Sequence, residues 1–182
     1  MVKTHDNFFD QKWISELASQ LINESWSPNN VANRNTFPNM ETGTQRLFGK
    51  LFYYRHTNDY IHYDNSNMNL VKNLIDAFQH IRNKTNLKMN LTEISGNLQF
   101  KNMDGSYHCD GPENRRVFIL MLCNEKISKK IGGEFFHYPS KKKILFEQGR
   151  LIEMTASDLH KANAFNKAHI ARMSIKWVGE LI

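Results

Sequence analysis

Hydrophobic side chains in the first half of the chain recur with helical spacing in two places. After Asp10, which can cap a helix, they return every three or four residues through about Asn23. A second stripe begins after Asn67 or Asn69 and ends near Lys84. Both patterns predict amphipathic helices that bury one face. The positions expected to be buried are Trp13, Ile14, Leu17, Ala18 and Leu21 in the first, and Leu70, Leu74, Ala77, Phe78 and Ile81 in the second.

The hydrophobic period changes from helical to alternating outside these two stripes. Residues 25–43 are rich in Asn, Pro and Thr and are expected to form a loop, whereas the aromatic, alternating residues 47–55 predict a strand. After Lys84, alternating stretches separated by glycine-containing turns predict a series of short strands. These expected strands cover residues 89–100, 107–110, 116–123, 134–138, 143–147, 150–154, 159–163 and 170–178.

Short strands at near-even spacing are typical of a sandwich or a jelly roll. We therefore expect a mainly β fold with flanking helices (α+β), in which both helices pack against one sheet. A chain of 182 residues with 40% hydrophobic and 23% charged residues has the size and composition of one ordinary domain with a packed core.

Composition also bears on the setting of the protein. The longest apolar run, 117–123, is far shorter than the roughly 20 residues of a membrane-spanning helix, and the N-terminus has no apolar signal region, so no membrane association is expected. The two cysteines form no CxxC pair, which fits a reducing, cytoplasmic environment. The net charge of +6 mildly favours anionic partners, although it equally serves solubility. Frequent asparagine and lysine are compatible with a phage or a small-genome bacterium as the source.

The first chemical signal is His108-Cys109-Asp110. In a strand, residues two apart share a face, so His108 and Asp110 are expected to point the same way. His160 begins a later expected strand. Two imidazoles and one carboxylate are the ligand set of the non-haem Fe(II) oxygenases, which leaves coordination positions open.

The second signal is Arg172-Met173-Ser174. By the same alternation, Arg172 and Ser174 share a face, and a guanidinium beside a hydroxyl suits a carboxylate. Alone, Arg172 would be interpreted as a surface residue. The order of the motifs gives it weight: His-x-Asp, an apolar strand, Gly132-Gly133, His160, and then Arg-x-Ser.

A second His-x-Asp pair, His62 and Asp64, lies just before the second helix. No long apolar strand precedes it, so we expect these two residues to be surface and capping residues. His137 is expected to be a strand histidine with satisfied ring nitrogens rather than a metal ligand.

Several segments of the C-terminal half resemble the 2-oxoglutarate- and Fe(II)-dependent dioxygenases of the prolyl 4-hydroxylase type, above all the small versions of phages and bacteria. The resemblance implies a double-stranded β-helix, which is a cupin-like jelly roll. It further implies a single catalytic domain over residues 1–182, with a helical support region at 1–86 and the β-helix core with the metal site at 87–182. The matching segments are residues 97–100, 104–110, 117–124, 132–135, 149–152, 159–160 and 170–177.

The resemblance also implies roles for individual residues. His108, Asp110 and His160 would be the iron ligands, and Arg172, assisted by Ser174, would bind the distal carboxylate of 2-oxoglutarate. With Fe(II), 2-oxoglutarate and O2, the enzyme would hydroxylate a C–H bond and release succinate, with ascorbate as an admissible reductant. The implied substrate is a prolyl or other peptide side chain, or a small molecule.

The sequence departs from the family in the residues around the cosubstrate. Many relatives carry a 2-oxoglutarate-binding tyrosine on the strand after His-x-Asp, but residues 118–123 contain none. Another tyrosine commonly precedes the motif, where this chain has Asn97 and Gln99. Either amide could supply the missing hydrogen bond. The interval from His160 to Arg172 is slightly long, which implies extra residues in the turn at 163–167.

Two other functions remain open at this point. Nucleic-acid demethylases on the same scaffold carry a second arginine after the first; residues 173–178 have none, which makes a nucleic-acid substrate less favoured. A cupin-like binding module without turnover is the other alternative, and succinate release would distinguish it. The substrate itself depends on loops such as 25–43, 58–69 and 110–116, which carry no transferable code, and the oligomeric state stays open.

Overall fold

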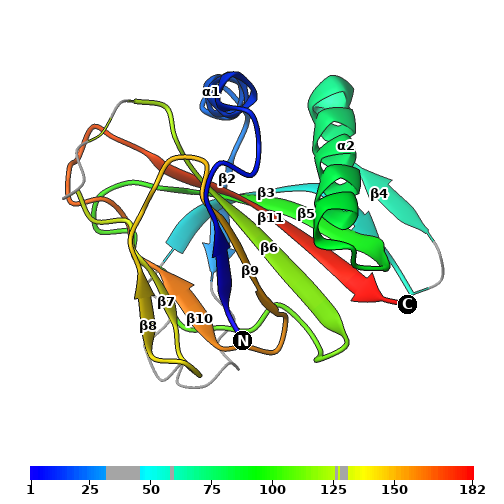
Figure 1. Cartoon of the computed structure of the whole chain (residues 1–182). Helices are drawn as coiled ribbons and strands as arrows, with labels where there is room; N and C mark the ends of the chain where they lie inside the picture. The colour runs from blue at the N-terminus through cyan, green and yellow to red at the C-terminus, as the bar shows by residue number, and fades with distance from the viewer. Residues whose placement is uncertain (32–45, 58–59, 126, 128–130) are drawn as a thin grey trace.

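The protein consists of three layers. The computed structural model describes residues 1–31, 46–57, 60–125, 127 and 131–182. Two helices lie on one face of a large antiparallel sheet, and a smaller sheet lies toward the opposite face, as Figure 1 shows. This arrangement confirms the mainly β fold with helices packed on one sheet.

Both expected helices are present, and both are capped as the sequence predicts. In α1 (Gln11–Leu21), the Asp10 side chain accepts hydrogen bonds from the Lys12 and Trp13 amides. In α2 (Met68–Thr85), Asn67 accepts from the Leu70 amide after a short 3-10 turn, η1 (Asn65–Asn67). The buried residues are Ile14, Leu17, Ala18 and Leu21 in α1, and Leu70, Val71, Leu74, Ala77, Phe78 and Ile81 in α2. Trp13, which was also expected to be buried, is only partly buried.

The strands form two antiparallel sheets. The large sheet has the order β1-β9-β6-β11-β5-β3-β2, with β4 paired to β3, and the small sheet has the order β10-β7-β8. The large sheet contains β1 (Lys3–His5), β2 (Ser27–Val31), β3 (Arg46–Arg55), β4 (Ile61–Tyr63), β5 (Met89–Gln99), β6 (Arg115–Cys123), β9 (Leu151–Thr155) and β11 (Arg172–Leu181). The small sheet contains β7 (Phe135–His137), β8 (Lys142–Ile144) and β10 (His160–Ala162).

The expected strands differ from the observed ones in four places. One is β4, which lies inside the expected loop at 58–69 and pairs with β3. Strand β1 was not expected, because three residues are too few to show a period; it is held to β9 by Lys3 and His5, which both contact the carboxylate of Glu153. Strand β2 occupies Ser27–Val31 inside the expected loop at 25–43, and the part of that loop beyond Val31 lies outside the described residues. Residues 107–110 form no strand; His108 makes only an isolated bridge to His160.

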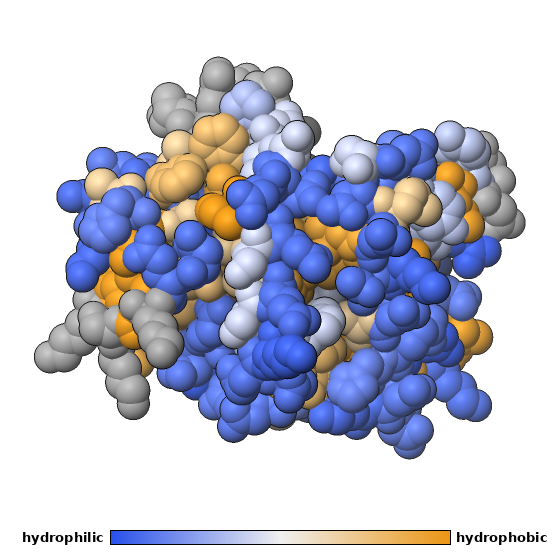
Figure 2. Space-filling view, turned by 90° about the horizontal axis from the view of Figure 1, so that it is seen from above, coloured by the Kyte–Doolittle hydropathy of each residue, from blue (hydrophilic) through white to orange (hydrophobic). Residues whose placement is uncertain are grey.

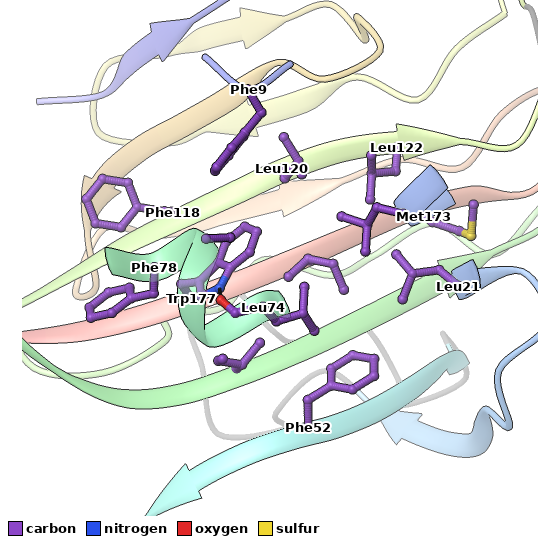
Figure 3. Close-up of a cluster of buried hydrophobic side chains, with 14 of the residues drawn as sticks. Phe9, Leu21, Phe52, Leu74, Phe78, Phe118, Leu120, Leu122, Met173 and Trp177 are labelled. Atoms are coloured by element: carbon purple, nitrogen blue, oxygen red, sulfur yellow. Dashed lines mark hydrogen bonds between the residues drawn. The ribbon is translucent and has the colours of Figure 1, made fainter. Parts of the chain in front are cut away.

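Strand β11 lies between the two largest of the three hydrophobic cores of the described structure. Met173, Ile175 and Trp177 face the helices, and the Trp177 Nε1–H donates to the carbonyl of Leu74 at 2.8 Å (Figure 3). Because side chains alternate along a strand, Arg172, Ser174 and Lys176 face the small sheet. The apolar part of that second core includes Ile119, Met121, Phe135, Ile144 and Ile152.

The surface over the helices is ordinary for a globular protein. Figure 2 shows a mostly hydrophilic face on which hydrophobic residues emerge in small groups between polar ones. Within the described residues, no helix is long and apolar enough to cross a membrane.

Candidate metal centre

His108, Asp110 and His160 come together between the two sheets. One possible ligand atom from each of these residues lies within 4.8 Å of the other two. His160 Nε2 is 3.2 Å from Asp110 Oδ2, and His108 Nε2 is 3.8 Å from Asp110 Oδ1. Among the described residues, this is the one group of three His, Cys, Asp or Glu side chains close enough to hold a metal ion.

The backbone pairs the two histidines directly. The His108 amide donates to the His160 carbonyl, and the His160 amide donates to the His108 carbonyl, both at 3.0 Å. Their ring centroids lie 4.5 Å apart. The expectation of a strand at 107–110 was wrong, but a single antiparallel bridge to the start of β10 is enough to place His108 and Asp110 beside His160.

Backbone carbonyls select the ring nitrogen that each histidine offers. His108 Nδ1 is 2.9 Å from the Ser106 carbonyl, and His160 Nδ1 is 2.8 Å from the Asp158 carbonyl. A carbonyl can only accept, so Nδ1 carries the proton in both rings and Nε2 has its lone pair free. Metal-binding histidines ordinarily donate their second ring nitrogen in this way.

Two atoms of the cluster test whether a metal fits. Asp110 Oδ2 and His160 Nε2 are buried and have no hydrogen-bond partner within the described structure. Buried polar atoms without partners are costly, and here both belong to the cluster and lie 3.2 Å apart. A cation coordinated by both would satisfy them, and two imidazoles with one carboxylate suit Fe(II). The residues therefore fit the metal that the sequence predicts.

The environment keeps His108 and Asp110 in the protonation states that a metal needs. Burial, reinforced by the neighbouring His160, lowers the pKa of His108 to about 4, so its ring is neutral at pH 7. Burial opposes ionisation of Asp110, but the Lys176 ammonium and the two histidines outweigh it and hold the pKa of Asp110 well below its usual range. Neutral imidazoles and an ionised carboxylate are the ligand forms required.

Arg172 lies in the same cavity, at its other end. Its side chain is 1% exposed; Nε–H donates to the Gly133 carbonyl at 3.1 Å, and Nη1–H donates to Gln99 Oε1 at 2.8 Å. Nη2 is buried without a partner, and no acidic side chain in the described part of the chain pairs with the guanidinium. Burial without a counter-charge lowers the pKa of Arg172 to about 10, still well above neutrality. The Arg172 guanidinium is thus a buried cation with an N–H group that an anion could accept from.

Position 133, beside Arg172, requires glycine for two reasons. Its φ of +78° belongs to the left-handed region, which favours glycine. A side chain at this position would also collide with the Phe165 ring. The Gly132-Gly133 motif thus lets the backbone carbonyl approach the guanidinium.

The two candidate amides lie on β5, but they differ in what they contact. Gln99 accepts from Arg172 and donates to the carbonyls of Met103 and Ala162, at 2.7 Å and 3.1 Å, so its polar atoms are already engaged. Asn97 lies opposite Ser174 in the β5–β11 register. The cavity is lined by His108, Asp110, His160, Arg172, Ser174, Asn97, Gln99 and Lys176, together with apolar residues such as Leu47, Ile119 and Phe135.

Sequence reasoning missed Lys176. Its Nζ is 2.7 Å from Asp110 Oδ1 and 3.0 Å from Glu93 Oε1, directly beside the candidate metal ligands. Burial opposes its charge, but the two carboxylates outweigh that effect and raise the pKa of Lys176. The available signal was its spacing: Lys176 is four residues after Arg172, on the same face of β11.

The other histidine motifs behave as expected. His62 is exposed on β4, and Asp64 caps η1 by accepting from the Ser66 amide. Asp64 differs from the expectation in one respect, because it is not an exposed surface residue: its side chain is 15% exposed and pairs at 2.9 Å with Lys50, whose side chain is 8% exposed. His137 is buried with both ring nitrogens partnered, by Ser140 Oγ at 2.7 Å and Asp158 Oδ2 at 2.9 Å.

Comparison with known proteins finds likeness in structure. No family model matches the sequence, and no curated protein matches it. A 2OG-Fe(II) oxygenase family oxidoreductase from Burkholderia pseudomallei aligns with a TM-score of 0.74 and 12% identity over 98% of this chain and 84% of that one.

Two prolyl hydroxylase structures are also similar. One, from Trichoplax adhaerens in complex with a peptide fragment, has a TM-score of 0.65 and 14% identity over 98% of this chain and 83% of that one. A prolyl-4-hydroxylase from Pseudomonas putida has a TM-score of 0.62 and 13% identity, covering 100% and 92%. At these identities the likeness establishes the fold: the chain has the double-stranded β-helix of the 2-oxoglutarate oxygenases.

Proposed function

We propose that the protein is a 2-oxoglutarate- and Fe(II)-dependent dioxygenase that hydroxylates a C–H bond. The observation that carries this proposal is one cavity with two complementary ends. His108, Asp110 and His160 form a cation site at one end, and Arg172, buried with an unpartnered N–H, forms an anion site at the other. A dicarboxylate that chelates a metal through one end and pairs with a guanidinium through the other matches both ends.

Each of the residues that line the candidate site has a definable task in that reaction. His108, Asp110 and His160 would hold Fe(II), which with 2-oxoglutarate and O2 supplies the oxidising chemistry. Arg172 binds the distal carboxylate, and the Ser174 hydroxyl on the same strand face adds a hydrogen bond. Gln99 and the Gly133 carbonyl fix the guanidinium, and burial of the cavity keeps water from the carboxylate.

The cavity between the two candidate sites is small and partly apolar. Its volume is about 50 Å³, and Leu47, at the start of β3, is among the apolar residues that line it.

We propose a prolyl or other peptide side chain as the substrate. Two of the similar structures are described as prolyl hydroxylases, one of them in complex with a peptide fragment. Residues 173–178 lack the second arginine expected of a demethylase, so a nucleic-acid substrate is less favoured.

The test has two steps: a spectroscopic measurement of cosubstrate binding to iron, and then detection of the hydroxylated product. Anaerobic addition of Fe(II) and 2-oxoglutarate to the purified protein should give the visible charge-transfer band of an iron-chelated keto acid. A screen of peptides and metabolites should then reveal a 2-oxoglutarate-dependent mass gain of one oxygen together with succinate. Iron binding without the band would contradict the proposal, and a band without succinate under any condition would favour a binding module.

A further inference from the structure

Lys176 and Glu93 form a charged chain that ends on the candidate metal ligand Asp110. Lys176 Nζ is 2.7 Å from Asp110 Oδ1 and 3.0 Å from Glu93 Oε1. Glu93 in turn accepts from Ser95 Oγ at 2.7 Å. The side chains of Lys176 and Glu93 are only 19% and 22% exposed, and that of Asp110 is 5% exposed.

The two oxygens of Asp110 therefore have different surroundings. Oδ1 accepts a charge-assisted hydrogen bond from Lys176. Oδ2 is buried, has no donor in the described structure, and lies 3.2 Å from the likewise unpartnered Nε2 of His160. Oδ1 is hydrogen-bonded to Lys176, and Oδ2 is the oxygen that can coordinate a cation.

We propose that Lys176 is a positioning residue that keeps Asp110 a one-oxygen metal ligand. This inference rests on the proposed function and goes beyond it by assigning a task to a residue outside the ligand set. With Oδ1 held by Lys176, the carboxylate cannot turn to chelate the metal through both oxygens. Coordination positions that a two-oxygen carboxylate would occupy remain open for the keto acid and for O2.

Glu93 restricts the conformation of the Lys176 side chain. A lysine side chain has many rotamers, and a single hydrogen bond to Asp110 would not fix it. Glu93, on the neighbouring strand β5, neutralises the ammonium and gives it a second ion-pair partner. Losing a hydrogen-bond partner that orients a metal ligand typically costs about 10–100-fold in metal affinity or activity. Because Lys176 is itself a cation next to the site, we expect the cost here in binding of the keto acid and not in binding of the metal.

The experiment compares Lys176→Met with Lys176→Gln, which are both neutral but differ in keeping an N–H donor. Co(II) is bound first, and its visible spectrum, which responds to the number of donor atoms, is recorded before 2-oxoglutarate is added. We expect an altered spectrum for Lys176→Met, with Co(II) bound at least as tightly as by the parent, because Oδ1 is released and a nearby cation is lost.

The second measurement is titration of 2-oxoglutarate into the metal-loaded proteins. We expect its affinity to fall about tenfold or more in Lys176→Met and less in Lys176→Gln. Glu93→Gln should change both readouts in the same direction by a smaller amount. Lys161→Met removes a lysine that lies over the Tyr107 ring and does not line the cavity, and it should leave both readouts unchanged.

The outcomes separate this inference from the proposed function. If the parent gives no charge-transfer band with Fe(II) and 2-oxoglutarate, the proposed function fails. If the parent gives the band but Lys176→Met keeps the parent cobalt spectrum and 2-oxoglutarate affinity, the positioning role is refuted. If Lys176→Met does not fold, unchanged readouts in both Lys176→Gln and Glu93→Gln refute it instead.

Discussion

Replacing Arg172 by methionine should separate cosubstrate binding from folding. The guanidinium is 1% exposed and has no acidic partner in the described structure, so the ligand carboxylate would be its counter-charge. Removing one member of a buried charged pair costs about 3–5 kcal/mol, and each tenfold in affinity is about 1.4 kcal/mol. Affinity for 2-oxoglutarate should therefore fall by about a hundredfold to a few thousandfold.

The same substitution should lower the free energy of unfolding by no more than about 3 kcal/mol. Burial lowers the pKa of Arg172 from its usual value to about 10, which corresponds to a cost of roughly 3 kcal/mol for keeping it charged at neutral pH. Methionine removes that cost. It also removes two hydrogen bonds, to Gln99 and to the Gly133 carbonyl, and leaves both acceptors unsatisfied, at about 1–3 kcal/mol each. The net change therefore lies between about 1 kcal/mol of stabilisation and about 3 kcal/mol of destabilisation.

The assay is titration of 2-oxoglutarate into metal-loaded parent and variant, with urea unfolding of the metal-free proteins in parallel. Metal binding should survive, because Arg172 is not among the ligands. Parent-like affinity for 2-oxoglutarate in the variant would show that Arg172 is not the carboxylate anchor. A loss of stability far beyond 3 kcal/mol would show that the guanidinium is not an unpaired charge waiting for a ligand.

Further predictions follow from the same geometry. Ser174→Ala should weaken 2-oxoglutarate by about 1–2 kcal/mol, and Arg172→Lys should fall between the parent and the methionine variant, as the same titration measures. His108→Ala or Asp110→Ala should abolish activity and Fe(II) binding, whereas His62→Ala should leave iron affinity unchanged; loss of iron in the His62 variant would contradict the site. Gly133→Ala should destabilise the fold by about 2 kcal/mol or more, measured by urea unfolding, because its φ of +78° and the Phe165 ring both exclude a side chain. The pKa of His108 is lowered to about 4, so between pH 6.5 and pH 4 the unfolded chain binds a proton that the metal-free folded protein does not. The free energy of unfolding should therefore fall as the pH is lowered from 6.5 toward 4, by at most about 3 kcal/mol. This contribution should be absent in His108→Gln.

Local patterns were sufficient for the helices and for most strands. Asp10 and Asn67 cap the helices, and the buried stripes lie where the spacing predicted, because capping and amphipathic burial act within a few turns of chain. Strand β1 escaped prediction because its partners, β9 and Glu153, lie far away in sequence. The expected strand at 107–110 does not form, since His108 needs only one backbone bridge to reach His160.

The candidate site likewise has features that the sequence predicts and features that only the tertiary structure shows. The sequence by itself singled out the residues that the structure brings to one cavity. His108, Asp110, His160, Arg172 and Ser174 were selected by their residue types, their order and a family resemblance, and all five line that cavity. Only the tertiary structure decided what surrounds them. Gln99 is engaged by Arg172 and the carbonyls of Met103 and Ala162, and Lys176 is held between Glu93 and Asp110. These contacts depend on how strands distant in sequence pair and face one another, and the energy of a buried charge depends on those neighbours, which no local pattern contains.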